Sequence, residues 1–140
     1  MEGKVFKDKA VLRVDKGEEV IESIFKFIEE NKITLANVSG IGASNNITVG
    51  LFNTETKEYN TADYFGEDFE ITAFMGNITT KDGEYYVHMH ITFSDENQNT
   101  FGGHLNKCII SGACEIFFDI IEGEVKRYFD EEIGLNIMKF

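Results

Sequence analysis

The sequence contains neither proline nor tryptophan, and among its 140 residues it has only two cysteines and three histidines. Without proline, turns must be built from glycine, asparagine and aspartate. Cys108 and Cys114 lie in one apolar run, where a single strand would hold them too far apart to form a disulfide bond. We therefore expect two buried free thiols rather than a disulfide.

Basic residues are scarce. The chain has 13 Lys and Arg against 25 Asp and Glu, a net charge of −12. Such a surface repels phosphate backbones and anionic membranes, so direct binding to nucleic acid or to a membrane is disfavoured. Long apolar runs are missing too, since MEGKVFKDKAVLRV has no stretch fit for a signal peptide and no segment approaches membrane-spanning length. These features predict a cytoplasmic protein.

Apolar residues make up 42% of the chain and include 13 phenylalanines. A length of 140 residues fits one domain with a Phe-filled core, and we expect a single domain over residues 1–140. One helix is predicted at about residues 17–31. Its apolar face recurs at helical spacing and comprises Val20, Ile21, Ile24, Phe25 and Ile28. The spacing of Asp15 and Glu18 is typical of a capping box, and Asn31 is expected to end the helix in a left-handed conformation.

The remaining segments predict strands separated by turns. NTETK and KDG each lie between two apolar-rich segments, which is typical of hairpins. The expected strands cover residues 5–14, 33–44, 47–53, 57–65, 69–80, 84–93, 108–121 and 124–130, with a short strand or ordered tail over 131–140. SGIGAS lacks the spacing of a phosphate-binding loop, and we interpret it as a structural turn between strands. The predicted fold class is α+β, with a mostly antiparallel β-sheet and one main helix.

All three histidines fall in one stretch, HMHITFSDENQNTFGGHL. If YYVHMHITF is a strand, period-two alternation places His88 and His90 on one face and the apolar side chains on the other. His104 follows a loop that can fold the chain back beside this strand, and Gly102 and Gly103 allow a close approach. Three neutral imidazoles leave one coordination position open, the arrangement of a catalytic-type zinc centre.

Two alternatives stay open for these residues. An isolated His-x-His on a strand is more often just part of a polar face, and convergence in space has to be shown. Glu115 places one carboxylate in an otherwise apolar strand, where a buried acid would need a partner or a metal. It is the candidate general base of this site, although it fits an exposed edge equally well.

Five segments, in order and spacing, carry a resemblance to a known family: GEEVIESIFKFIEENKI, VSGIGA, MGNI, HMHI and GGHL. Together they resemble the PPC domain, which is conserved in plants and prokaryotes, from about Val11 to Ile121. The resemblance implies an α+β fold that assembles as a homotrimer, with His88, His90 and His104 as the ligands of a zinc ion. The fold is also similar to that of acetolactate decarboxylase, in which a His-x-His and a later histidine hold a catalytic zinc.

Plant members of that family join the domain to AT-hooks, short Arg-Gly-Arg-Pro segments that enter the DNA minor groove. The 140 residues contain no such segment and no proline. The DNA-binding label that often accompanies the family is therefore poorly supported for this chain, for which the resemblance implies an assembly role.

Three functions follow as hypotheses, and whether the protein is an enzyme stays open. The first in rank is an assembly or regulatory module in which zinc fixes a homotrimer. The second is a zinc-dependent enzyme that hydrolyses or decarboxylates a small carbonyl or ester substrate, with Glu115 as general base. The third is association with DNA, which the net charge disfavours.

Overall fold

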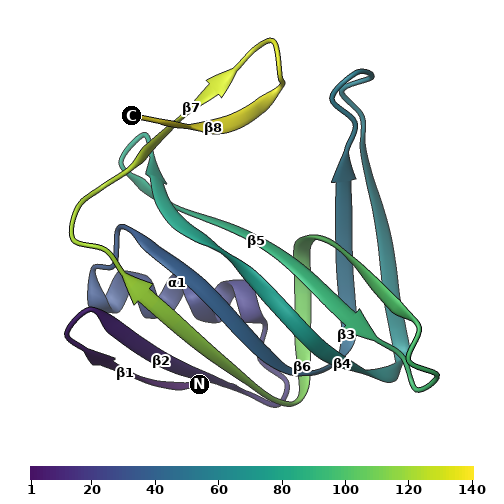
Figure 1. Ribbon diagram of the computed structural model, residues 1–140. Helices are drawn as coiled ribbons and strands as arrows, with labels where there is room; N and C mark the ends of the chain where they lie inside the picture. The colour runs from purple at the N-terminus through teal and green to yellow at the C-terminus, as the bar shows by residue number, and fades with distance from the viewer.

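The computed structural model describes residues 1–140 and contains one helix and eight strands (Figure 1). The helix α1 spans Val20–Asn31. The strands are β1 (Glu2–Phe6), β2 (Lys9–Asp15), β3 (Ala36–Phe52), β4 (Tyr59–Lys81), β5 (Glu84–Ser94), β6 (Thr100–Ile120), β7 (Lys126–Asp130) and β8 (Leu135–Lys139). The expected class, a mostly antiparallel sheet with one helix, is confirmed.

The strand β6 organises the sheet because it has partners on both of its edges. Its first part pairs antiparallel with β5, the stretch from His104 to Ile120 pairs with β3, and its last part also pairs with β2. Since β3 pairs with β4 and β4 with β5, these four strands form a closed circuit. Outside it, β1 extends the sheet beyond β2, and the hairpin β7–β8 is attached to β4 by a single parallel pair.

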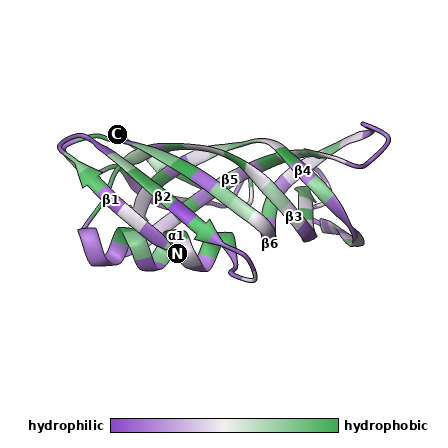
Figure 2. Cartoon of the chain, turned by 90° about the horizontal axis from the view of Figure 1, so that it is seen from below, coloured by the Kyte–Doolittle hydropathy of each residue, from purple (hydrophilic) through white to green (hydrophobic).

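The helix covers only one face of the sheet (Figure 2). Val20, Ile24, Phe27 and Ile28 are buried on the side of α1 that faces the strands. The rings of Tyr64, Phe69, Phe93 and Phe101 form an aromatic cluster in and against the core, with the Tyr64 and Phe93 centroids 5.0 Å apart. The core is therefore built from phenylalanine and aliphatic side chains, as the composition predicts.

The ends of the helix differ from the prediction. The helix begins at Val20 because Glu19 is its N-cap, whose carboxylate accepts a hydrogen bond from the Glu22 amide at 2.7 Å. Glu18 does reach back to the Asp15 amide, at 2.8 Å, but this bond closes a turn ahead of the helix. Lys32, not Asn31, adopts the left-handed conformation at the C-terminal end, with φ 55°.

The predicted turn at SGIGAS is wrong. Residues 39–44 lie within β3, which runs unbroken from Ala36 to Phe52 and bends at irregular pairings near Gly40–Gly42 and Ser44–Asn46. Glycine permits such bulges without ending a strand, because it tolerates irregular backbone conformations and close neighbours. In the same way, the two strands predicted within residues 57–80 are one strand, β4. The first predicted strand, in contrast, is divided into β1 and β2 by a turn at Lys7, with φ 52°.

Other local predictions are confirmed. The NTETK segment connects β3 to β4, and Asp82 and Gly83 form a tight turn between β4 and β5, both with positive φ. Cys108 and Cys114 are buried free thiols, and burial raises the pKa of each to about 12. The single helix is too short and too polar to cross a membrane.

Gly76 provides a test of how closely β4 and β5 approach. A Cβ at this position would overlap the carbonyl oxygen of His88, whereas a Cβ at Gly112 would meet only the Ala43 Cβ, at 3.6 Å. We expect Gly76→Ala to lower the free energy of unfolding by about 1–3 kcal/mol, because the two backbones must separate. Urea denaturation measures this change, with Gly112→Ala as the matched control. Equal stability of the two variants would contradict the close approach.

Candidate metal centre

The strand β5 places two histidines on the face of the sheet that α1 leaves uncovered. Met89, Ile91 and Phe93 alternate with them and are buried in the core. His88 lies opposite Asn77 of β4, and His90 lies opposite Met75. Period-two alternation therefore determines the direction of both imidazoles, as the sequence predicts.

The strand β6 brings the third histidine to the same place. His104 pairs with His90 of β5 on one side and with Gly50 of β3 on the other. Gly102 and Gly103 make this double pairing possible, because a Cβ at Gly102 would meet the Ile91 carbonyl oxygen at 2.5 Å and one at Gly103 would meet the Gly50 carbonyl oxygen at 3.0 Å. The expected close approach at these two glycines is thus observed.

The three imidazoles converge. The ring centroids are 5.1 Å apart for His88 and His90, 5.2 Å for His88 and His104, and 5.4 Å for His90 and His104. One nitrogen from each ring lies within 4.8 Å of the nitrogens from the other two. All three side chains come from one chain, so the group needs no second subunit to assemble.

The spacing of one donor pair, on His88 and His90, fits a tetrahedral metal ion. With zinc–nitrogen bonds of about 2.0–2.1 Å, tetrahedral geometry separates two ligand nitrogens by roughly 3.3 Å. The Nε2 atoms of His88 and His90 are 3.2 Å apart. A hydrogen bond between two neutral rings would have a similar length. The structure thus contains a three-histidine group able to hold a metal ion.

Electrostatics keeps His88 and His104 in the form that binds metals. Burial, followed by the neighbouring His104, Arg127 and His90, lowers the pKa of His88 to about 4. Burial and then His90 also lower the pKa of His104. Because metals bind the neutral imidazole, these shifts favour metal binding at neutral pH.

The histidines line a pocket of about 850 Å³. Its remaining wall is aromatic, aliphatic and amide-bearing, and includes Tyr59, Tyr64 and Tyr86. Tyr59 stands edge-on to the His104 ring at 6.4 Å, and its hydroxyl donates a hydrogen bond to Asn106 Oδ1 at 2.8 Å. None of the 18 lining residues is Asp, Glu, Lys or Arg. The pocket has the size and the apolar character of a small-molecule site.

The C-terminal hairpin β7–β8 supplies part of the pocket wall through Leu135 and Asn136. Arg127 anchors it: its guanidinium donates to Thr79 Oγ1, to the Asn136 carbonyl and to Asn77 Oδ1, at 2.8–2.9 Å. The same guanidinium lies over the Tyr86 ring, 4.7 Å from its centroid. Arg127 thus connects the hairpin to β4 through hydrogen bonds and to the histidine-bearing strand β5 through the Tyr86 ring.

Glu115, the predicted general base, is not among these residues. It is exposed on β6, in register with Arg13 of β2 and Ile41 of β3. It lies outside the three-histidine group and does not line the pocket. Glu115 faces solvent because strand alternation turns its neighbours Cys114 and Ile116 into the core.

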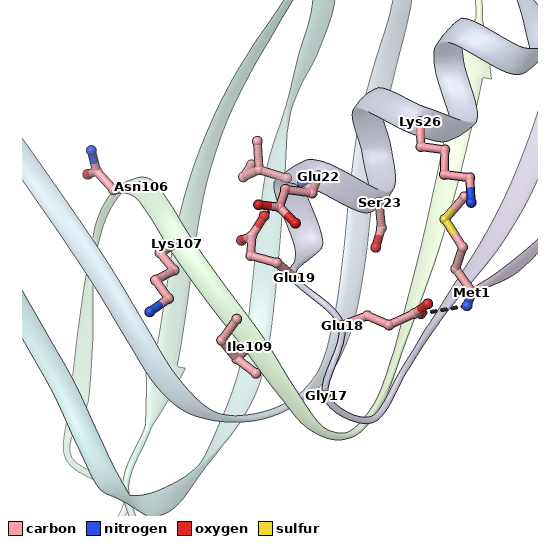
Figure 3. A pocket seen from close by; sticks show the side chains of 11 residues that line it. Met1, Gly17, Glu18, Glu19, Glu22, Ser23, Lys26, Asn106, Lys107 and Ile109 are labelled. Carbon is pink, nitrogen blue, oxygen red and sulfur yellow. Dashed lines mark hydrogen bonds and ion pairs between the residues drawn. The ribbon is translucent and has the colours of Figure 1, made fainter.

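A second pocket, of about 680 Å³, lies at the N-terminal end of α1 (Figure 3). Two of its three glutamate side chains already accept backbone hydrogen bonds, and Glu19 accepts them from the amides of Glu22 and Cys108. Glu18, which Figure 3 shows bonded to the N-terminal amine of Met1, also accepts from the Asp15 amide. These acids stabilise the entry to the helix, and none of the three histidines lies among them.

Sequence reasoning missed two residues of this region. Arg127 gave no signal, because none of its acceptors is its neighbour in sequence: Thr79 and Asn77 belong to β4, and Asn136 belongs to β8. Tyr59 was expected only as a strand residue of the NTETK hairpin. Asn77 accepts a hydrogen bond from Arg127, and Arg13 forms surface ion pairs with Glu2 and Asp15.

Comparison with protein families decides the relationship. The family model of the Plants and Prokaryotes Conserved (PCC) domain matches residues 1–122. The chain belongs to this family. The match confirms the resemblance drawn from the sequence motifs, and it ends before the hairpin β7–β8. No curated protein matches the sequence.

Solved structures agree with the family. A protein from Archaeoglobus fulgidus described as metal-containing is 34% identical, with a TM-score of 0.88, over 99% of this chain and 97% of that one. A Bacteroides thetaiotaomicron protein whose name proposes DNA binding is 29% identical (TM-score 0.95, 99% and 96% covered). A plant- and prokaryote-conserved protein from Pyrococcus horikoshii is 30% identical (TM-score 0.85, 94% and 91% covered).

A more distant likeness confirms the expected similarity of fold to acetolactate decarboxylase. The enzyme from Bacillus subtilis has a TM-score of 0.53 at 17% identity, and the alignment covers 84% of this chain and 54% of the enzyme. At that identity the likeness concerns the fold alone.

The lowered pKa of His88 predicts how the metal-free protein responds to acid. His88 titrates near 6.5 in the unfolded chain and at about 4 in the folded one. Between these values the unfolded chain binds more protons, so the free energy of unfolding falls as the pH is lowered. We expect His88→Gln to flatten this fall in chelator-treated protein, measured by denaturation at a series of pH values. Above pH 7 the difference between the two proteins should stay constant, and an unchanged slope below pH 6.5 would refute the assignment.

Proposed function

We propose that this chain is a metal-dependent small-molecule-binding protein that works as a homotrimer. The observation that carries the proposal is the convergence of all three histidines at the wall of a pocket of about 850 Å³. We assign zinc as the ion, because three neutral imidazoles with one open position suit it. The description of the Archaeoglobus fulgidus relative as metal-containing supports a metal at this site.

The geometry favours ligand binding over a purely structural role for the ion. Because the three donors belong to one chain, an ion that they hold does not by itself connect subunits. Structural zinc sites are almost always closed by four protein ligands, whereas sites with three protein ligands keep a position for water or substrate. This reverses the ranking that the sequence alone suggested, in which zinc served to fix the trimer.

Metal binding has a direct test. We expect the purified protein, dialysed against zinc and then against buffer, to retain about one zinc per chain by elemental analysis, as a single three-histidine site requires. A His88→Ala/His90→Ala double variant should retain none, because one imidazole cannot hold the ion. Thr92→Ala is the matched control, since Thr92 lies exposed on the same face of β5. Equal zinc content in the double variant would overturn the proposal.

Self-association rests on the uncovered face of the sheet. Ile41, Met75 and Phe117 are 56%, 61% and 55% exposed on adjacent strands of that face, and α1 lies on the other side. Large exposed apolar groups that gather on one face are typical of subunit interfaces. We assign this face to contacts with further copies of the chain, and the family resemblance supplies the number three.

We expect Phe117→Asp to dissociate the oligomer, because it would place a charge in an apolar interface. Sedimentation velocity at several protein concentrations measures the change, and circular dichroism checks that the variant is folded. Phe140→Asp is the control, because Phe140 is 99% exposed at the C-terminal end. A wild-type protein that sediments as a monomer would refute the assembly.

Catalysis is the second candidate function, and the open coordination position favours it. Zinc in such a site supplies Lewis-acid chemistry for a carbonyl or ester group. Glu115 does not line the pocket, so we do not assign it as the base; Tyr59 and Asn106 are the polar groups that lie beside His104. An esterase and decarboxylase screen of zinc-loaded protein tests this function, and activity that persists in the His88→Ala/His90→Ala variant would eliminate it.

Direct DNA binding receives no support beyond the names of two of the solved relatives. The net charge of −12 opposes association with phosphate groups. We therefore do not assign a DNA-binding function to this chain.

A further inference from the structure

The pocket at the histidines lacks the acidic side chains that give the chain its net negative charge. Asp and Glu account for 25 of 140 residues, yet none lines the pocket, and neither does any Lys or Arg. An acidic surface that excludes its carboxylates from one cavity leaves that cavity free of negative charge. An anion would meet no like charge there, whereas a cation would find no partner.

A buried cation lies directly behind the pocket wall. Arg127 is 8% exposed and forms no ion pair, because its three hydrogen-bond acceptors are a hydroxyl, a backbone carbonyl and a side-chain amide. Two residues that it contacts, Tyr86 and Asn136, line the pocket. Burying a charge without a counter-charge costs free energy. The fold nevertheless keeps the positive charge of Arg127 buried without an ion-pair partner, beside the histidines. A divalent ion at the histidines would add to that charge.

The rest of the wall defines the shape of the anion. Tyr59, Tyr64, Leu51 and Phe52 provide an aromatic and aliphatic surface. A phosphate group carries two charges and needs several N–H donors around its oxygens, whereas here no Lys or Arg side chain reaches the pocket. A carboxylate carries one charge and can occupy a single open position on zinc.

Building on the metal site proposed above, we infer that this pocket takes a small carboxylic acid with an apolar or aromatic body. Its carboxylate lies at the three histidines, on the side where Arg127 is buried, and its body packs against Tyr59, Tyr64 and Leu51. The amide side chains of the wall hydrogen-bond any further polar groups. If the site is catalytic, this inference favours acids over neutral esters as substrates.

Calorimetric titration of the zinc-loaded protein with four matched probes tests the inference. We expect 3-phenylpropionate to bind at least about tenfold more tightly than 3-phenylpropan-1-ol and 3-phenylpropylamine, which lack the negative charge. Propionate should bind about tenfold or more weakly than 3-phenylpropionate because it lacks the apolar body. If the alcohol or the amine binds as tightly as the acid, the inference is wrong. Phenyl phosphate is a further probe. If it binds more tightly than 3-phenylpropionate, the ligand is a phosphate and the inference of a carboxylic acid is wrong.

Single isosteric variants locate the effect in this pocket. Asn60→Asp and Asn106→Asp each add a negative charge to the wall at nearly constant volume, and the latter keeps the acceptor for the Tyr59 hydroxyl. We expect either change to weaken 3-phenylpropionate about tenfold and to leave 3-phenylpropan-1-ol unaffected. Asn97→Asp is the control, because Asn97 is exposed on the loop between β5 and β6, outside the pocket. Equal weakening by Asn97→Asp would show a general effect of net charge and would overturn the inference.

The metal proposal and this inference fail in different ways. Zinc content is measured on every sample before titration. A protein that holds no zinc refutes the metal site, and the inference with it. A protein that holds about one zinc per chain but does not prefer the acid refutes the inference alone.

Discussion

The double pairing of His104 is the constraint on which this structure depends. One residue of β6 pairs with His90 on one side and with Gly50 on the other, and this closes the circuit of β3, β4, β5 and β6. The closure needs backbones to approach closely, which is why glycine occupies positions 102 and 103. A side chain at either position would separate β6 from β5 or β3 and would move the third imidazole away from the other two.

The closed circuit of strands also separates the apolar core from the polar face that carries the histidines. Core side chains fill the inside of the circuit, and the histidines lie on the outer face beside the β3–β4 hairpin. This hairpin and the hairpin β7–β8 touch each other, because Lys57 donates to the carbonyl groups of Glu132 and Ile133. The two hairpins and the histidine-bearing strands together form the pocket. An acidic chain has thus folded so that none of its carboxylates lines the cavity around the metal-binding group.

Local patterns predicted much of the fold, and the errors have physical causes. The helix was found from its apolar face, but its first residue was misplaced because the capping bond of Glu18 closes a turn before Val20. The hairpin at Asp82 and Gly83 was found from turn chemistry. The SGIGAS turn was wrong because glycine permits both turns and bulges, and only the partners β4 and β6 determine which of the two forms. Nothing local distinguishes a strand that ends from one that bends.

The sequence by itself determined that His88 and His90 share one face of a strand, because side chains in an extended chain alternate regardless of what surrounds them. It also determined the acidic surface and the amphipathic helix. Only the tertiary structure decided that His104 joins the pair and that Glu115 does not. It also decided that Arg127 is buried behind the pocket without an ion-pair partner. These outcomes depend on the register between strands distant in sequence, which is set by the packing of the whole core and not by any local pattern.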